Sequence, residues 1–211
     1  MLRKKGSNDL NLFWERQGMK KVIFPPSHNL IFFLFIFFFW FLPTPGHGAT
    51  ILSPGMKLPA FRLSSPASAD ALHYLGLTKA EPFSLSQVPS KLILVEILSV
   101  FCQYCQKQTP AMNRIYQYTQ ADPNLAKKIK MIGIVAVGDQ KAVEAFKTAY
   151  RVKFPLIPDP KMEIFGKLQN PSIPLLLLVN RQGDILLTHS GYLNDADDFF
   201  GKMKKIAANQ K

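Results

Sequence analysis

The stretch VEILSVFCQYCQKQTP, residues 95–110, contains both cysteines of this 211-residue chain. Cys102 and Cys105 are separated by Gln103 and Tyr104, so they form a CxxC pair. Two cysteines placed at random would fall three positions apart roughly once in a hundred cases, so the spacing is itself a signal. An apolar run precedes the pair and a helical pattern follows it, which places the pair between a buried strand and a helix.

Three kinds of chemistry compete for such a pair. A zinc site needs four ligands, usually a second CxxC or two histidines, whereas the histidines after residue 50, His73 and His189, are isolated from each other. A structural disulfide would close only a two-residue loop and would constrain the unfolded chain little. A redox pair fits best, because the unpaired N–H groups and the dipole of a helix N-terminus stabilise a thiolate at Cys102. Cys105, one turn further along, can then attack a mixed disulfide within the same molecule.

The patterns along the rest of the chain predict a mixed α/β fold. Strands are expected at residues 92–98, 131–137, 175–180 and 185–189, and helices from the cysteines to about residue 118, at 140–150, at 161–168 and from Asn194 or Asp195 onwards. The first two strands are joined through a helix and should be parallel, whereas the turn at 181–184 makes the last two a hairpin. Residues 154–160 are too rich in proline for a central strand and should form a loop or a sheet edge.

The chain resembles the thioredoxin superfamily over about residues 90–208. Beyond the CxxC pair, Pro110 stands five residues after the second cysteine, and Gly191 follows the fourth strand, as in that superfamily. The stretch SIPLLLLVNRQGD, residues 172–184, is similar to the strand that opens with a cis-proline. The resemblance implies a cis bond at Ile173–Pro174, with Pro171 as the competing position. It also implies a three-layer α/β/α fold with a central mixed β-sheet and an N-terminal extension.

Glu96 is the fifth matching position. On composition alone, this residue would be an edge-strand acid that faces water. Thioredoxins, however, place a buried carboxylate six residues before the first cysteine, and Glu96 occupies that place. Burial in an apolar sheet raises the pKa of a carboxylate, so the resemblance implies that Glu96 accepts and returns the proton of Cys105 near neutral pH.

Within the superfamily, the chain is most similar to the exported TlpA/ResA-like branch. GMKLPAFRL at 55–63 and FSLSQVPSKLILVEI at 83–97 resemble the opening segments of that branch. The chain departs from it at three positions near the cysteines. Phe101 stands where the branch usually has Trp, Tyr104 replaces the proline of CxPC, and Gln108 replaces a frequent Glu. These departures leave the direction of electron flow open.

The resemblance implies a thiol-disulfide oxidoreductase that acts on protein disulfides, with the reductive direction favoured. Cys102 would attack, Cys105 and Glu96 would resolve the mixed disulfide, and the backbone of Ile173 would pair with the substrate beside Pro174. Phe101, Gln103 and Tyr104 would complete the substrate surface. No organic cofactor or metal is expected beyond the redox-active Cys102–Cys105 disulfide, and the electron donor would be a membrane protein of the disulfide-relay kind.

Alternatives from other classes remain. One is a disulfide-donating oxidase of the same fold. Another is a copper-handling chaperone that uses both thiolates and His189, since thiolates suit Cu(I). A third is a non-catalytic binding module. Peroxiredoxins share the fold, but their P-x-x-x-[TS]-x-x-C motif does not precede Cys102.

The N-terminal part predicts export. Residues 30–42 form a 13-residue apolar run without charge, shorter than the about 20 residues of a bilayer span and typical of a secretory signal. Basic residues precede it, and Gly46-His47-Gly48 gives a small-x-small cleavage pattern before Ala49. Residues 1–48 are therefore interpreted as a basic leader and signal peptide with a true start at Met19, residues 49–90 as the extension and 91–211 as the thioredoxin-like domain. An uncleaved N-terminal anchor is the alternative, and both place the domain in the periplasm or another extracytoplasmic compartment.

The chain carries a formal charge of +12, but its basic residues do not predict a nucleic-acid partner. The densest groups after the leader are lysines 127, 128 and 130 and lysines 202, 204 and 205. Neither group has the arginine content or the interleaved aromatics of a nucleic-acid surface. Both are interpreted as solvated helix faces.

Overall fold

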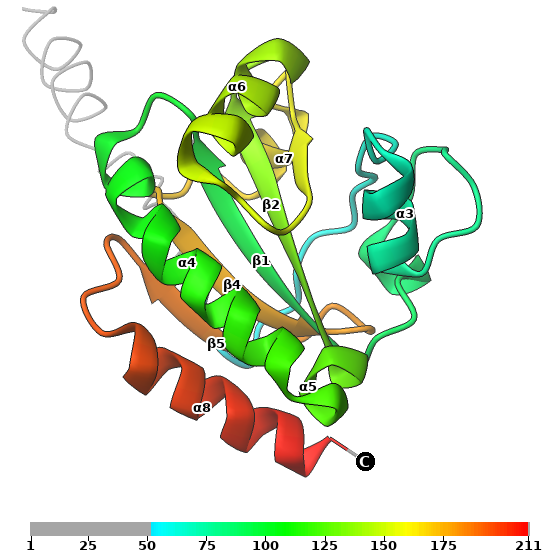
Figure 1. Cartoon of the computed structure of the whole chain (residues 1–211), viewed down its shortest axis with the longest axis vertical. Helices are drawn as coiled ribbons and strands as arrows, with labels where there is room; N and C mark the ends of the chain where they lie inside the picture. The colour runs from blue at the N-terminus through cyan, green and yellow to red at the C-terminus, as the bar shows by residue number, and fades with distance from the viewer. Residues whose placement is uncertain (1–51, 211) are drawn as a thin grey trace, which may run out of the picture. The chain divides into compact units, whose positions relative to one another are not determined.

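The computed structural model describes residues 52–210, and a five-stranded mixed sheet forms their central layer (Figure 1). The strand order is β3-β2-β1-β4-β5. The strands are β1 Leu92–Ser99, β2 Ile129–Val137, β3 Leu156–Pro158, β4 Leu175–Asn180 and β5 Ile185–Ser190. The predictions of a leader, a signal peptide and a start at Met19 lie outside the described residues.

Two of the strand pairings, the parallel pair of β1 with β2 and the hairpin of β4 with β5, follow the sequence-based prediction, whereas the pairing of β1 with β4 was not predicted. β1 pairs in parallel with β2 and antiparallel with β4, and β4 and β5 form the antiparallel hairpin. β3 pairs in parallel with β2 at the edge, where a proline costs no ladder hydrogen bond to a further strand. All eight residues of β1 are buried, because this strand lies in the middle of the sheet with packed side chains on both faces.

Helices cover one face of the sheet. They include α4 Gln103–Ala121, α5 Pro123–Lys128, α6 Gln140–Tyr150 and α8 Ala196–Asn209, and α4 and α8 lie side by side across the strands (Figure 1). Met112 of α4, Val143 of α6 and Phe199 of α8 pack in one apolar cluster with alternate residues of β1, such as Leu94. The period of two along a strand sends the intervening residues to the opposite face.

The opposite face is covered by a layer that is only partly helical. It contains α3 Ala69–Leu75, the 3-10 helix η1 Leu85–Gln87, α7 Glu163–Lys167 and extended pieces of residues 52–88. Phe61, Leu85 and Ile164 pack here against Ile93 and the other β1 residues of that face. The predicted three-layer α/β/α architecture is therefore confirmed, with the N-terminal extension forming much of one outer layer.

The sequence prediction missed α5. Asp122 and Pro123 were expected only to end the preceding helix, which they do. The Asp122 side chain, however, also accepts hydrogen bonds from the backbone N–H groups of Asn124 and Leu125, and Pro123 occupies the first turn of a new helix. Proline is favoured at that position because its missing N–H would have had no helical partner.

The interpretation of lysines 127, 128 and 130 as a solvated face is wrong for two of the three. The Lys128 Nζ atom donates to the carbonyl oxygens of Ala207 and Gln210, each at 3.1 Å, at the end of α8. The Lys130 Nζ atom lies 4.7 Å from the centre of the Tyr74 ring. Cations at a helix C-terminus and over an aromatic face are stabilising, so these lysines hold elements together.

Across residues 52–210, none of the helices combines the length and the apolar character that crossing a membrane requires. These residues fall within one compact unit of the chain.

Candidate active site

The two cysteines lie where β1 passes into α4. Cys102 is the N-cap residue of α4, and its Sγ atom accepts a hydrogen bond from the backbone N–H of Cys105 at 3.3 Å. An N-cap side chain normally satisfies one of the first N–H groups of a helix, and here a sulfur atom does so. Both cysteines are free thiols; Cys102 is half-buried and Cys105 is fully buried.

A short loop of hydrogen bonds holds Cys102 in this place. The backbone carbonyl of Ser99 accepts from the Cys102 N–H at 3.1 Å, and the Ser99 hydroxyl accepts from the Phe101 N–H at 3.2 Å. The side-chain amide of Gln106 donates to the Val100 carbonyl at 2.9 Å. Because these bonds tie both sides of the turn, the Cys102 Sγ atom is positioned by the end of β1 and the first turn of α4.

Cys105 has no exposed surface, and this burial determines the protonation state of its thiol. Burial raises the pKa of its thiol well above the usual range, and the hydrogen bond with Cys102 and the charge of Glu96 act in the same direction. A thiol with such a pKa stays protonated at neutral pH and must lose its proton to a nearby base before it can attack.

Glu96 can be that base. It lies in β1, is 3% exposed, and burial raises its pKa to about 7, although the hydrogen bond from Gln108 acts to lower it. The residues that pair with Glu96 on the neighbouring strands are Gly133 and Leu176, neither of which is charged. The burial that the family resemblance implies is therefore confirmed, and the composition-based alternative of an edge-strand acid facing water is wrong, because β1 is central and its neighbours exclude solvent. A group with a pKa near 7 can accept and return a proton under physiological conditions.

Gln108 is a site residue whose role the sequence did not reveal. It is fully buried in α4, one turn beyond Cys105. Its Nε2 atom donates to Glu96 Oε1 at 3.0 Å, and its Oε1 atom accepts from the Leu193 N–H at 2.8 Å. The one signal available in the sequence was that Gln108 stands where related sequences often carry Glu.

The segment before β4 borders the same end of the sheet. The Ile173–Pro174 peptide bond is cis, at the bond for which the sequence predicts this conformation. The first residue of β4, Leu175, pairs with Ile97 near the end of β1, so Pro174 lies at the sheet end that carries the cysteines. Ile173 is partly exposed and packs, like Cys102, against the helix-side core.

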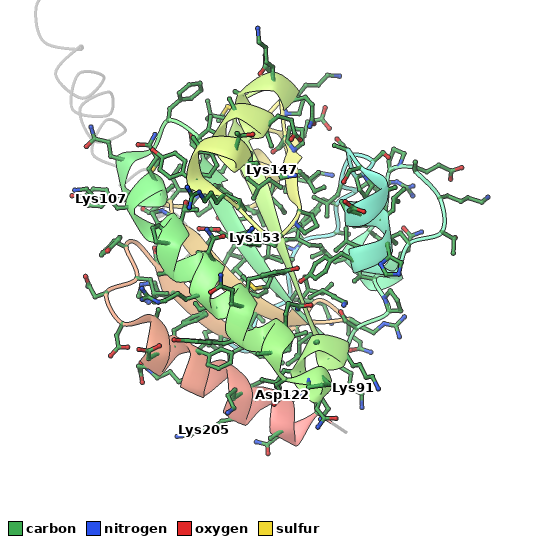
Figure 2. All side chains as sticks on the ribbon, in the orientation of Figure 1. Lys91, Lys107, Asp122, Lys147, Lys153 and Lys205 are labelled. Carbon is green, nitrogen blue, oxygen red and sulfur yellow. The ribbon has the colours of Figure 1, made fainter. Side chains whose placement is uncertain are left out.

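Exposed aromatic side chains surround Cys102. Phe101 is 69% exposed and Tyr104 is 61% exposed, and Gln103 between the cysteines is also exposed. The sequence did not indicate Tyr192, which is 40% exposed and places its ring centre 6.5 Å from that of Tyr104. Lys107 lies 5.8 Å from the Tyr104 ring centre and projects from the first turns of α4 (Figure 2).

His189, the histidine considered for a copper site, makes other contacts. Its Nε2 atom lies 3.2 Å from the Tyr192 carbonyl oxygen, and its ring packs edge-on against Phe199. Within residues 52–210, no three His, Cys, Asp or Glu side chains lie close enough together to hold a metal ion.

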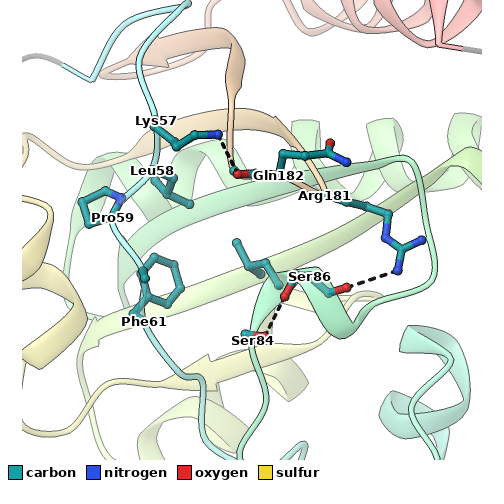
Figure 3. A pocket seen from close by; sticks show the side chains of 11 residues that line it. Lys57, Leu58, Pro59, Phe61, Ser84, Ser86, Arg181 and Gln182 are labelled. Atoms are coloured by element: carbon teal, nitrogen blue, oxygen red, sulfur yellow. Dashed lines mark hydrogen bonds between the residues drawn. The ribbon is translucent and has the colours of Figure 1, made fainter.

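A separate pocket of about 320 Å³ lies at the opposite end of the sheet, at the turn between β4 and β5 (Figure 3). Lys57, Phe61, Leu85 and Arg181 are among its lining residues, and Arg181 donates to the Ser86 carbonyl. None of the site residues described above lines this pocket, so it is not part of the cysteine site.

Comparisons with known proteins agree with this fold. The chain is 22% identical over 120 residues to the thiol-disulfide oxidoreductase ResA of Bacillus subtilis, covering 56% of this chain and 64% of that protein. It is 27% identical over 122 residues to the sporulation thiol-disulfide oxidoreductase A of the same organism, covering 57% and 72%. The thioredoxin domain of a thiol-disulfide oxidoreductase from Bacteroides vulgatus superposes with a TM-score of 0.56 at 18% identity, over 74% of this chain and 99% of that domain, so the fold is thioredoxin-like. The AhpC/TSA family model matches residues 54–187, and the chain therefore belongs to the AhpC/TSA family.

Proposed function

We propose that the protein is an exported thiol-disulfide oxidoreductase that reduces protein disulfides through Cys102 and Cys105. The observation that carries this proposal is the arrangement of three groups. A half-buried sulfur at the start of α4 lies one turn from a buried thiol, and a buried carboxyl with a pKa of about 7 lies behind them. The names of the relatives support the reaction class.

In the first step, the Cys102 thiolate attacks one sulfur of the substrate disulfide. A bond forms between that sulfur and Cys102 Sγ, the substrate S–S bond breaks, and the departing sulfur leaves as a thiolate that takes a proton from water. The hydrogen bond from the Cys105 N–H supports negative charge on Cys102 Sγ before the attack.

In the second step, Cys105 gives its proton to Glu96 and attacks Cys102 Sγ. The mixed disulfide breaks, and the second substrate sulfur leaves as a thiolate and is protonated. Two electrons have then passed from the Cys102–Cys105 dithiol to the substrate, and the protein carries the disulfide. This step requires a base near Cys105, because the pKa of the buried thiol is raised.

The substrate would bind across the exposed aromatic side chains and the segment before β4. An extended substrate strand can pair its backbone with that of Ile173, beside Pro174, while Phe101, Gln103 and Tyr104 contact its side chains. Tyr192 extends the same surface, since its ring lies against that of Tyr104.

The reductive direction rests on the two residues between the cysteines. Oxidases of this fold often carry a histidine there that stabilises the thiolate, whereas Gln103 and Tyr104 carry no charge. A reductase must be reduced again, and an exported one would receive electrons from a membrane protein of the disulfide-relay kind. The thiol pair is its own redox centre, so the proposal needs no organic cofactor or metal.

Export rests on residues 1–48, whose basic segment and apolar run at 30–42 fit a secretory signal that starts at Met19. Fractionation of the source cells, followed by N-terminal sequencing of the protein, would distinguish a signal cleaved before Ala49 from an uncleaved anchor. Recovery of the protein with residues 1–48 intact in the cytoplasm would contradict export.

Trapping of mixed disulfides tests the reaction. Cys102→Ser should abolish the reduction of a protein disulfide such as that of insulin, and Cys105→Ser should accumulate substrate adducts at Cys102 that dithiothreitol releases. Hydrogen peroxide serves as the contrasting substrate, because a peroxidase would consume it with Cys102 alone. Absence of adducts with Cys105→Ser, or faster turnover of peroxide than of the disulfide, would contradict the proposed function.

A further inference from the structure

The hydrogen bonds of Gln108 fix the orientation of its side-chain amide. The Leu193 N–H can only donate, so the atom that faces it at 2.8 Å must be the amide oxygen. The amide nitrogen therefore faces Glu96 Oε1, at 3.0 Å. Gln108 has no exposed surface, so solvent cannot replace either bond.

This arrangement holds the Glu96 carboxyl in one orientation. The amide N–H takes one of the two lone-pair sites of Oε1, which leaves Oε2 as the oxygen better placed to receive the proton that Cys105 releases. A charge-assisted hydrogen bond also favours the ionised carboxylate, which is the form that can accept a proton.

Gln108 also connects Glu96 to a loop that borders the cysteines. Leu193 lies between β5 and α8, next to Tyr192, whose ring lies against that of Tyr104. In the same loop, the Gly191 N–H donates to the Pro174 carbonyl at 2.8 Å. A single buried amide therefore joins the proton acceptor to the loop that carries part of the proposed substrate surface.

We propose that Gln108 is a positioning residue for Glu96: it orients the carboxyl toward Cys105 and ties it to the loop at residues 191–195. This inference rests on the proposed function, because Glu96 is the proton acceptor in the second step of that reaction. Loss of the Gln108 N–H would leave the carboxylate less stabilised, so a larger fraction of Glu96 would be protonated at neutral pH and unable to accept the proton.

The groups that can titrate near Glu96 are few. Across the sheet its neighbours are Gly133 and Leu176, and from α4 the facing groups are Cys105 and, next to it, Cys102. His189 pairs with Leu176 and so lies two strands away on the same face, about 10 Å from Glu96 by strand spacing. The pKa of Glu96 can therefore be followed separately from the pKa values of Cys102 and Cys105, provided that each group is measured by its own signal.

The test compares Gln108→Leu with Asn113→Leu. Asn113 is a matched control, since it is also on α4 and its amide also makes one donated and one accepted hydrogen bond, here both with backbone groups: it donates to the Tyr150 carbonyl at 3.0 Å and accepts from the Lys153 N–H at 3.3 Å. In single-turnover reactions, Gln108→Leu should move the pH midpoint of the resolving step upward by about one pH unit, the size expected for one lost charge-assisted hydrogen bond. Asn113→Leu should leave that midpoint in place, and neither variant should change the rate at which Cys102 attacks a small disulfide reagent, which does not need the substrate surface at Tyr104 and Tyr192.

Direct titration of the Glu96 carboxyl tests the role of Gln108 without requiring that the protein reduce a disulfide. The carboxyl carbon of Glu96, followed by ¹³C NMR in the reduced protein, should titrate about one pH unit higher in Gln108→Leu than in the wild type, whether or not a protein disulfide is reduced. If Gln108→Leu does not fold, Gln108→Glu keeps the acceptor for Leu193 and places two carboxyls side by side, which should raise the upper titration of the pair. An unchanged Glu96 titration in the variant that folds would overturn the role of Gln108. If the Glu96 titration shifts as expected but the wild-type protein reduces no protein disulfide, the proposed function alone would be overturned.

Discussion

The Gln108 side chain on α4 donates a hydrogen bond to the Glu96 carboxyl on β1, with a nitrogen–oxygen distance of 3.0 Å in a region closed to solvent. This bond joins α4, which carries Cys105, to β1, which ends at Ser99, three residues before Cys102. It therefore connects the proposed proton acceptor to both thiols through rigid elements.

Substitution of Glu96 by Gln should affect only one half of the reaction. The variant keeps the shape of the side chain and can still accept the Gln108 N–H, but it cannot take a proton from Cys105. The rate of mixed-disulfide resolution at pH 7 should fall by about 100-fold or more, the usual contribution of a general base. Rapid-quench separation of the adducts would measure this rate, and an unchanged resolving step would show that Cys105 loses its proton to another group.

The same carboxyl should make stability depend on pH. The pKa of Glu96 is about 7 in the folded protein against the ordinary 4.5 of a solvent-exposed glutamate, so between these pH values the folded state holds a proton that the unfolded state has lost. Stability should therefore fall as pH rises through this window, by on the order of 3 kcal/mol from this group.

Urea unfolding of the reduced protein at pH 4.5 and pH 8 would measure this effect. Glu96→Gln is the control, because the difference between the wild type and this variant cancels the other titrating groups. An equal pH dependence of stability in the two proteins would mean that folding does not raise the pKa of Glu96.

The tyrosine pair beside the cysteines should contribute to substrate binding. Removal of either ring by Tyr104→Ala or Tyr192→Ala should lower kcat/KM for a protein disulfide by about tenfold, since exposed aromatic side chains often carry interface energy. The reaction of Cys102 with a small disulfide reagent should stay the same.

Tyr118→Ala provides the control for surface tyrosines on the same helix. Tyr118 is 43% exposed, and its ring centre lies 5.3 Å from that of Phe200, on α8. Equal losses of kcat/KM for Tyr118→Ala and Tyr192→Ala would argue against a substrate surface at residues 104 and 192.

The strand before the cysteines and the helix that begins at them could be predicted because their signals are local. Residues 92–98 form one apolar run, and the CxxC pair followed by a helical pattern fixes where α4 begins. The edge position of residues 154–160 also followed from a local cause, since proline cannot donate to a sheet ladder. α5 was missed because Asp122 and Pro123 can both end one helix and begin another, and sequence alone indicated only the first role.

The contacts that complete the site could not be predicted from local patterns. Gln108 and Leu193 are 85 positions apart, and their hydrogen bond exists only because α4 and the loop before α8 are packed together. Tyr192 faces Tyr104 for the same reason. The burial of Glu96 could be predicted only from the family resemblance, because composition alone favoured an acid that faces solvent.

The reduction potential of the Cys102–Cys105 pair tests the central claim most directly. The purified protein would be equilibrated with defined ratios of reduced and oxidised dithiothreitol and glutathione, and the thiols would be counted by alkylation. A reductase should have a potential near or below about −270 mV, the value of thioredoxin. A potential toward about −120 mV, as in DsbA, would show that the pair donates disulfides and would contradict the reductive direction.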